Sequence, residues 1–275
     1  MVVTAPAKIN LTLRVLRKRE DGFHELETLI YPLPQLHDRL TVEKAAAFQL
    51  TCTDETVPVD ETNLVTKAVR ALEKKTDRDL PCQIHLEKRI PHGAGLGGGS
   101  SDAASTLLAL NDLFSLDFSL DELSAIGAEL GSDVPVFLYQ VPCWCRGRGE
   151  QITPAPEVQL SGPVLLLKPS FGVATPDAYK RWQASRELQG VSYAPQTVDR
   201  IGLVNDLERP VFEKHLFLAE LKTFLQSQPG VRAAMMSGSG STVFALLEKD
   251  CDGEKLGETV KRMLDPTLSF FLLAD

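Results

Sequence analysis

The 275-residue sequence lacks any apolar stretch long enough to cross a bilayer, which takes about 20 consecutive residues. Its apolar runs are short, among them those at residues 134–139, 164–167 and 270–274. The N-terminus also lacks the basic start and apolar stretch of a signal peptide. We therefore expect a cytoplasmic protein with no membrane partner, or a stromal protein if a plastid transit peptide has been removed.

Positive charge is also in short supply. The chain has 29 Lys and Arg against 37 Asp and Glu, which gives a net charge of −8. A nucleic-acid backbone or an anionic lipid surface selects for the opposite balance, so we expect no nucleic-acid partner. Anions can still bind where a local pocket overrides the global charge.

Cysteines are few and badly spaced for metal or redox chemistry. There are five of them, and Cys143 and Cys145 have one residue between them instead of the two of common zinc and redox motifs. The sequence therefore predicts reduced, buried thiols. Hydrophobic residues make up 43% and charged residues 24%, values typical of a globular chain with a substantial core.

Strand and helix patterns alternate along the chain, which predicts an α+β protein of two lobes. Apolar residues at every second position predict a strand over residues 8–15, and a capping box at Ser119 predicts the start of a helix that ends at Gly131. A stretch rich in Pro and Gly at 153–163 divides the expected lobes, 1–155 and 156–275. Further strands are expected at 25–31, 40–43, 48–52, 82–90, 164–168, 232–236 and 242–248, and further helices at 63–75, 102–114, 176–186, 218–227 and 254–264.

Residues 91–101, called the glycine loop below, carry the strongest chemical signal. Five of the seven residues from Gly93 to Gly99 are glycine, which costs backbone entropy unless the backbone lies against a ligand. Ser100, Ser101 and Asp102 then offer capping side chains for a helix. Free amides ending at a helix N-terminus predict a phosphate site. The string is not a P-loop, but it matches the dinucleotide fingerprint, so a Rossmann dehydrogenase stays open.

Lys8 and Asp133 are candidates for the chemistry of phosphoryl transfer. Asp133 lies between the helix end at Gly131 and an expected proline-stiffened strand at Val134 and Pro135, which would fix its carboxylate. A carboxylate can take the proton of an attacking hydroxyl, and a nearby lysine keeps it ionised and stabilises the alkoxide. Each residue by itself also fits an ordinary surface position.

Several motifs together resemble those of the GHMP small-molecule kinases. They are residues 6–11 with Gly22-Phe23-His24, the glycine loop, and the serine- and glycine-rich stretch 237–241. Further markers lie at 131–137, 147–150 and 205–208. The resemblance implies a GHMP kinase fold, with an N-terminal lobe like the second domain of ribosomal protein S5 and a ferredoxin-like C-terminal lobe. It also implies an ATP- and Mg²⁺-dependent kinase.

The same resemblance implies roles for particular residues. The catalytic pair would be Lys8 and Asp133, and Ser100 or Ser101 would bind Mg²⁺. The acceptor would be a cytidine diphosphate sugar-alcohol, with its cytosine between the rings of Phe23 and Tyr179 and its edge read by His24. ATP would lie on Pro91, His92, Gly93, Ala94, Gly95, Leu96, Gly97, Gly98, Gly99, Ser100 and Ser101, with Asn63 and Lys88 near the adenosine, and further acceptor contacts would come from Asn10, Thr175, Gly238, Ser239 and Gly240.

Two departures from the family and several alternatives remain. Phe23 stands where the family has tyrosine, and the bulky segment 140–145 replaces small residues. Another acceptor, such as mevalonate, homoserine or a sugar, is possible, although a small polyol needs no stacking pair. A non-catalytic nucleotide-binding module on the same fold is a further alternative. The stretch 237–241 could also be a tight hairpin and nothing more.

Overall fold

The computed structural model describes residues 1–274, and these form two compact units that interleave along the chain. The first unit comprises residues 1–8, 32–92 and 97–154, and the second comprises 9–31, 93–96 and the chain from 155 onward. Strands β1 (Val2–Lys18) and β2 (His24–Lys44) contribute residues to both. Our division into lobes at residue 155 stays a prediction, because compactness alone does not define a domain.

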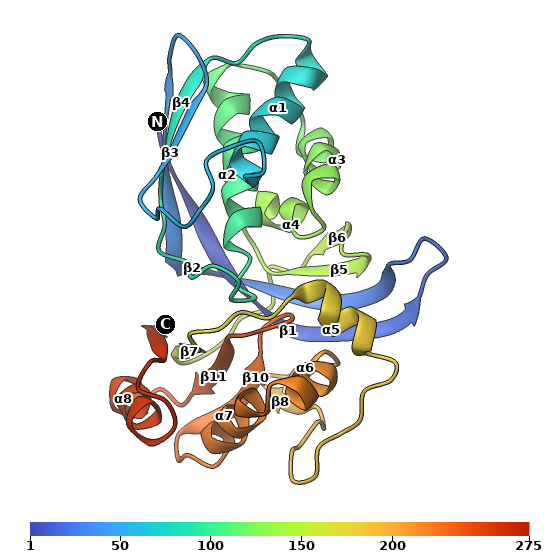
Figure 1. Cartoon of the computed structure of the whole chain (residues 1–275), viewed down its shortest axis with the longest axis vertical. Coiled ribbons are helices and arrows are strands. Elements are labelled where there is room, and N and C mark those ends of the chain that lie inside the picture. Colours follow the sequence, from blue (N-terminus) through green and yellow to red (C-terminus); the bar gives the residue numbers. More distant parts are fainter. Residues whose placement is uncertain (275) are drawn as a thin grey trace. The chain divides into compact units, whose positions relative to one another are not determined.

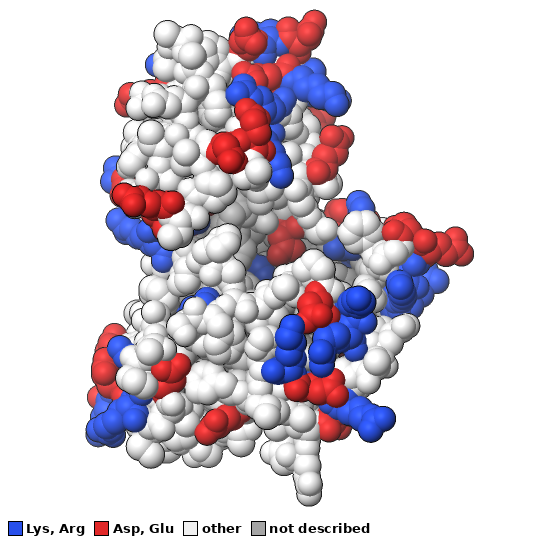
Figure 2. Space-filling view, viewed as in Figure 1, with Lys and Arg blue, Asp and Glu red and all other residues white. Residues whose placement is uncertain are grey.

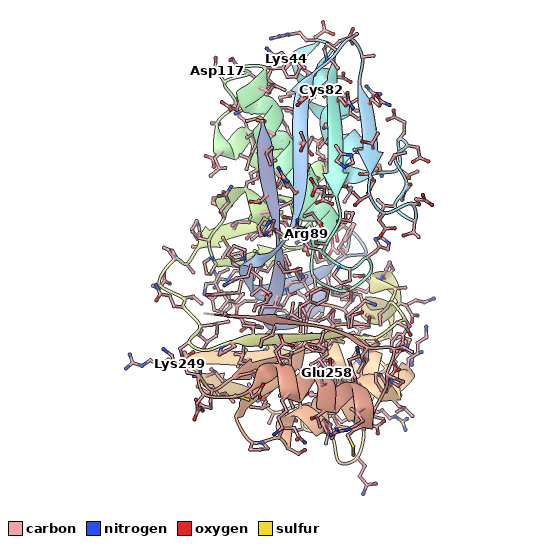
Figure 3. All side chains as sticks on the ribbon, turned by 90° about the vertical axis from the view of Figure 1, so that its left-hand side faces the viewer. Lys44, Cys82, Arg89, Asp117, Lys249 and Glu258 are labelled. Atoms are coloured by element: carbon pink, nitrogen blue, oxygen red, sulfur yellow. The ribbon has the colours of Figure 1, made fainter. Side chains whose placement is uncertain are left out.

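In the first unit, three helices lie against one face of a sheet (Figure 1). β2 pairs antiparallel with β4 (Cys82–Glu87), and β3 (Gln49–Cys52) adds to β4 in parallel. Figure 3 shows Lys44 and Cys82 together at one end of this pairing and Arg89 toward the other, where the chain enters the glycine loop. The helices are α1 (Leu64–Thr76), α2 (Gly98–Leu113) and α3 (Leu120–Leu130).

Local sequence explains two of these helices. Val65, Ala68, Val69 and Leu72 place one apolar face of α1 in the core, and burial of each large side chain contributes about 1.5–3 kcal/mol. The predicted capping box of α3 is confirmed, because Ser119 accepts a hydrogen bond from the amide of Glu122 and the Glu122 carboxylate accepts one from the amide of Ser119.

Two predictions around the glycine loop are wrong. The helix after the loop begins at Gly98 and not at Asp102, and its N-cap is Gly97, whose left-handed φ of 74° suits glycine. The serines therefore lie within the first turn and do not cap the helix. The segment after Asp133 is the helix α4 (Val134–Tyr139) and not a strand, because proline is well tolerated in the first turn of a helix.

Other boundaries also differ from the prediction. The strands expected at 25–31 and 40–43 are one continuous strand, β2. Within the first unit, the bulky segment leads into a hairpin of β5 (Cys143–Gly147) and β6 (Gln151–Pro154), which the sequence patterns did not indicate. The helix expected at 176–186 is the shorter α5 (Thr175–Arg181) of the second unit.

The second unit is built on an antiparallel sheet with the strand order β10, β11, β7, β12. These strands are Val231–Met236, Val243–Leu247, Val164–Lys168 and Ser269–Leu273. Beside them, β1 runs parallel to β9 (Ile201–Asn205), which pairs with β8 (Gln196–Val198). The remaining helices are α6 (Glu208–Lys214), α7 (Leu216–Gln226) and α8 (Gly253–Met263).

The core of the second unit draws on both ends of the chain. Leu165 and Leu167 of β7 and Phe212 of α6 are fully buried in it, together with Leu13 and Leu26 from the N-terminal strands. Because β7 is covered on both faces, its sequence is a continuous apolar run instead of an alternating one. Segments far apart in the sequence thus share one hydrophobic core.

Three global features bear on the expectations from composition. Among residues 1–274, no helix has the length and apolar character to span a bilayer. All five cysteines are free, with Cys82, Cys143 and Cys145 buried and the other two half-buried. Figure 2 shows acidic and basic side chains interspersed on the face in view.

Candidate active site

Lys8 and Asp133 form an ion pair in the first unit. The Nζ of Lys8 lies 3.6 Å from a carboxylate oxygen of Asp133. The lysine side chain is 4% exposed, whereas the aspartate side chain is 43% exposed. Asp133 is the N-cap residue of α4, but its side chain makes no capping hydrogen bond, so the helix backbone does not engage its carboxylate. The pair thus combines a buried cation with a carboxylate that a substrate can reach.

The end of the glycine loop packs directly against this pair. A Cβ atom at Gly97 would lie 3.0 Å from Cγ of Lys8 and 2.6 Å from the ring of Phe137 in α4. Such distances leave no room for a side chain, so glycine at position 97 lets the start of α2 approach the lysine stem. The N-terminal amides of α2 and the Lys8 ammonium therefore belong to one part of the first unit.

A buried ionic cluster links the residues just before the glycine loop to the helix that follows the loop. The Lys88 ammonium binds the carboxylates of both Asp38 and Asp102, the latter at 2.8 Å. The other oxygen of Asp38 accepts the backbone N–H groups of Arg89 and Ile90 at 2.5 and 2.8 Å. Asp38 thus holds the residues entering the loop, while Lys88 ties it to Asp102 in the helix that leaves the loop.

Burial changes the protonation of this cluster. Two carboxylates share one ammonium, and desolvation raises the pKa of Asp102 to about 7, opposed by the charge of Lys88. The pKa of Lys88 is raised by the two carboxylates, although burial acts against this. The Asp102 carboxyl therefore titrates near neutral pH.

The two residues expected near the adenosine have structural partners. Asn63 caps α1 by accepting the amide of Val65, and its own amide donates to the carbonyl of Pro58. Lys88 is engaged by Asp38 and Asp102. A contact of either residue with a nucleotide stays a prediction.

The donors available for a magnesium ion are restricted. Within residues 1–274 there is no cluster of three or more His, Cys, Asp or Glu residues that could hold a metal. The hydroxyl of Ser101 is fully buried and finds no hydrogen-bond partner among the described residues, whereas Ser100 is half-buried. Magnesium binds to proteins through one or two groups together with substrate phosphates, so Ser100 fits that arrangement better than Ser101.

Aromatic residues gather in the second unit. The rings of His24 and Tyr179 stack with centroids 5.3 Å apart, and Trp182 meets the His24 ring edge-on at 6.0 Å. Phe23 is 51% exposed. Burial, and to a lesser degree the charge of Lys18, lowers the pKa of His24, so its imidazole is neutral at pH 7 and can both donate and accept. Asn10, by contrast, is buried and donates to the hydroxyl of Thr28.

Residues 237–241, called the glycine hairpin below, join β10 to β11 and contact the tip of the glycine loop. The Ser237 hydroxyl donates to the carbonyl of Gly95 at 2.9 Å, and the amide of Thr242 donates to the carbonyl of Ala94 at 3.1 Å. A Cβ atom at Gly95 would lie only 2.3 Å from the carbonyl oxygen of Ser237. The hydroxyls of Ser239 and Thr175 lie 2.7 Å apart, which links the hairpin to α5 and hence to the element that carries Tyr179.

The structure also presents residues that the sequence patterns did not single out. Asp38 and Asp102 complete the cluster around Lys88, and Trp182 completes the aromatic group around His24. No local pattern marks them, because each gains its partner only through folding. The spacing of Tyr179 and Trp182 on one helical turn is the single signal that could have indicated a shared face.

Comparisons with known proteins agree with this architecture. The sequence signature of the GHMP kinases N terminal domain matches residues 63–140, and that of the GHMP kinases C terminal domain matches residues 186–265. These matches define the class as the two-domain small-molecule kinases that use ATP as phosphoryl donor. They confirm the predicted α+β GHMP kinase fold and the prediction of an enzyme.

Relatives place the chain within this class. A 4-diphosphocytidyl-2-C-methyl-D-erythritol kinase of Methylacidiphilum infernorum is 41% identical over 90% of this chain and 86% of its own length. The enzyme of that name from Syntrophus aciditrophicus is 42% identical over 94% of this chain and 93% of its own. A crystal structure of a 4-(cytidine 5'-diphospho)-2C-methyl-D-erythritol kinase, 35% identical, superposes with a TM-score of 0.78 over the full length of both chains. The chain therefore belongs to the 4-diphosphocytidyl-2-C-methyl-D-erythritol kinases of the GHMP family.

Proposed function

We propose that this chain transfers the γ-phosphoryl group of ATP to the 2-hydroxyl of 4-diphosphocytidyl-2-C-methyl-D-erythritol, a step of non-mevalonate isoprenoid precursor synthesis. The observation that carries the proposal is the pairing of a buried Lys8 ammonium with the accessible carboxylate of Asp133 at 3.6 Å. A non-catalytic nucleotide-binding module needs no such pair. We also propose a cytoplasmic location, and a monomer or weak homodimer.

In this proposal Asp133 acts as the general base. Its carboxylate takes the proton of the acceptor hydroxyl as that oxygen forms a bond to the γ-phosphorus. The bond from the γ-phosphorus to the bridging oxygen of ADP breaks, and the products are ADP and a phosphate monoester. Lys8 keeps Asp133 ionised by its charge and stabilises negative charge on the attacking oxygen.

The glycine loop would hold the triphosphate through its free amides. The positive end of α2 begins at Gly98, where a bound anion gains from the helix dipole. Mg²⁺, when bound with the nucleotide, would supply charge neutralisation on the triphosphate, and the hydroxyl of Ser100 would hold it. The hydrogen bonds from Lys88 to Asp102 and from the Arg89 amide to Asp38 would hold the two ends of the loop, and with them these amides, in place before the nucleotide binds.

The aromatic group of the second unit would recognise the cytosine of the acceptor. Stacking of a base on an aromatic ring contributes about 1–3 kcal/mol. Tyr179 and Phe23 supply ring faces, and the neutral imidazole of His24 can read the donor and acceptor pattern of the base edge. A small polyol acceptor has no base that could stack on these rings. The aromatic group therefore favours the cytidine compound over mevalonate, homoserine or a sugar.

An ADP-release assay tests the proposal. The purified chain is supplied with ATP and Mg²⁺ and, in parallel, with 4-diphosphocytidyl-2-C-methyl-D-erythritol, mevalonate, homoserine and galactose. We expect ADP release that depends on the cytidine compound alone. Turnover with another acceptor would assign the chain to a different substrate. ATP binding without turnover on any acceptor would favour the non-catalytic module.

A further inference from the structure

In the motif Asn205-Asp206-Leu207-Glu208, all residues but the half-buried Asp206 are buried. Asn205 is the last residue of β9 and is 4% exposed. Its amide nitrogen donates to the carbonyl of Met236 at 2.8 Å and to the carbonyl of Gly238 at 2.7 Å. Its side-chain oxygen accepts the amide of Leu207 at 2.9 Å. The Asn205 side chain therefore forms hydrogen bonds both with the strand that precedes the hairpin and with the hairpin itself.

A second anchor from the same motif holds the strand end. Glu208 accepts the amide of Met236 at 2.9 Å, and its other oxygen pairs with the buried ammonium of Lys222 at 2.6 Å. Lys222 also donates to the carbonyl of Ser192. Because Glu208, Lys222 and Met236 are buried and hydrogen-bonded, any shift of Met236 would leave polar groups without partners, at about 1–3 kcal/mol each.

The glycine hairpin, which these hydrogen bonds hold in place, contacts two candidate ligand-binding elements. Ser237 of the hairpin and Thr242, which directly follows it, form hydrogen bonds with the tip of the glycine loop at Gly95 and Ala94. Ser239 in the middle of the hairpin meets Thr175 at the start of α5, which carries Tyr179. The position of the hairpin thus sets both the nucleotide loop tip and the helix with the stacking ring.

We propose that Asn205 is a positioning residue of the phosphoryl transfer reaction, which acts by fixing the glycine hairpin. In this role Asn205 acts through the hairpin and contacts neither substrate itself. Its two hydrogen bonds set the hairpin, and the hairpin in turn sets the tip of the glycine loop and the N-terminus of α5. For the choice of acceptor this inference rests on the proposed function, but for nucleotide binding it does not.

The chain offers a matched control on the same strand. Gln196 of β8 holds β10 at Ala234 in the same manner, by donating to its carbonyl at 2.9 Å and accepting its amide at 3.1 Å. Ala234 lies two residues before Met236 and contacts neither the glycine loop nor α5 in any bond described above. Gln196→Glu therefore loses the donor to the Ala234 carbonyl, as Asn205→Asp loses its own donors, but it leaves the hydrogen bonds of Asn205 to the hairpin intact.

The experiment compares Asn205→Asp with Gln196→Glu. In Asn205→Asp a carboxylate faces two carbonyl oxygens, and the hairpin must shift. We expect ATP affinity, measured by calorimetry without acceptor, to fall about tenfold or more. We expect kcat to fall about a hundredfold, as small misplacements of reacting groups do. Gln196→Glu lowers Tm but keeps ATP affinity and kcat close to those of the unmodified chain.

Two results would overturn the inference. One is an Asn205→Asp chain that keeps its ATP affinity and kcat, and the other is a Gln196→Glu chain that loses as much of both. If the unmodified chain does not phosphorylate the cytidine acceptor, the proposed function fails, while the ATP affinities still decide the role of Asn205.

A second variant and a second measurement test the inference even if Asn205→Asp does not fold. Asn205→Ala removes the clamp without adding charge, and circular dichroism shows whether each variant is folded. If neither variant folds, hydrogen exchange on the unmodified chain decides the matter. A non-hydrolysable ATP analogue should slow amide exchange across residues 237–242, and unchanged exchange there would refute the inference.

Discussion

At the scale of single residues, the candidate site depends on unequal burial. The Lys8 ammonium is shielded from water while the Asp133 carboxylate remains half-exposed. An ion pair of two exposed groups contributes little, because water screens it. A buried cation acts more strongly on its partner, since the local dielectric is lower. In the proposed mechanism, this asymmetry suits Asp133 to receive a proton from an alcohol and Lys8 to keep Asp133 ionised.

Removing either member of the pair should abolish turnover but not folding. We expect Asp133→Asn and Lys8→Met to lower kcat by about 10²–10⁴-fold, the usual contribution of a positioned general base. Nucleotide affinity should change little, because the amides of the glycine loop remain. Steady-state ADP release and calorimetry with ATP measure the two quantities.

The exposed pair of Arg39 and Glu87 serves as the control. Its atoms lie 3.5 Å apart, similar to the candidate catalytic pair, but its cation Arg39 is exposed to water, unlike the buried Lys8. Arg39→Met should leave kcat unchanged. Near-normal turnover of both Asp133→Asn and Lys8→Met would reject the proposed roles.

The Asp102 carboxyl should make stability depend on pH. Its pKa is about 7 in the folded chain against an ordinary value of 3.8, mainly because of burial. A raised pKa means that the folded state binds the proton more tightly. The contribution of Asp102 protonation to the free energy of unfolding is therefore complete below pH 3.8. It is lost as the pH rises through 7, by at most about 1.4 kcal/mol per pH unit.

Denaturant unfolding at pH 5, 6, 7 and 8 tests this dependence. The Asp102→Asn variant keeps an acceptor oxygen for Lys88 but cannot ionise, so its free energy of unfolding should decline less between pH 5 and 7 than that of the unmodified chain. Identical slopes for the two chains would show that Asp102 is ionised throughout this range.

At the scale of elements, composition located the glycine loop but misjudged the helix that follows. Serines and aspartate before an apolar run are typical of an N-cap, yet α2 begins at Gly98. The reason is tertiary: the chain must pass close to Lys8 and Phe137, and only glycine at 97 permits this. Similarly, Val134 and Pro135 resemble the start of a strand by residue type, but they form α4, whose proline lies in the first turn.

Gly97→Ala should therefore impair catalysis through the lysine. A methyl group there would meet Phe137 at 2.6 Å and the Lys8 stem at 3.0 Å, and the φ of 74° is strained for alanine. We expect kcat to fall about a hundredfold from the displacement of Lys8, with a loss of stability of about 1–3 kcal/mol. ADP release and thermal unfolding measure the two effects.

Gly202→Ala is the matched substitution without crowding. A Cβ atom at Gly202 would meet nothing within 4 Å. Its kcat should equal that of the unmodified chain. Equal turnover of the Gly97→Ala variant would show that the Lys8 stem has room to adjust.

At the scale of the whole molecule, the second compact unit includes segments from the N-terminal part of the chain. Residues 9–31 and 93–96 belong to the second compact unit. Leu13, Val15 and Leu26 from this N-terminal part are buried in the same cluster as Phe212 and Leu221. Without them, the cluster would lose large apolar side chains and expose its interior to water.

A fragment comprising residues 156–275 should consequently fail to fold cooperatively. The missing residues would leave cavities, and loss of each large buried side chain costs about 2–5 kcal/mol, which together exceed the stability of an ordinary domain. Circular dichroism on heating should show a broad, non-cooperative change for the fragment and a sharp transition for the full chain. A sharp transition of the fragment would contradict this expectation.

The sequence by itself determined what depends on local chemistry: the glycine loop, the capping box at Ser119, the apolar face of α1 and the charge balance. Family motifs added the fold and the class of reaction. Only the tertiary structure decided which side chains meet, because Lys8 with Asp133, Asp38 with Lys88 and Asn205 with Gly238 are far apart in the chain. Such pairs form when burial forces polar groups to find partners, and no periodicity in the sequence records that requirement.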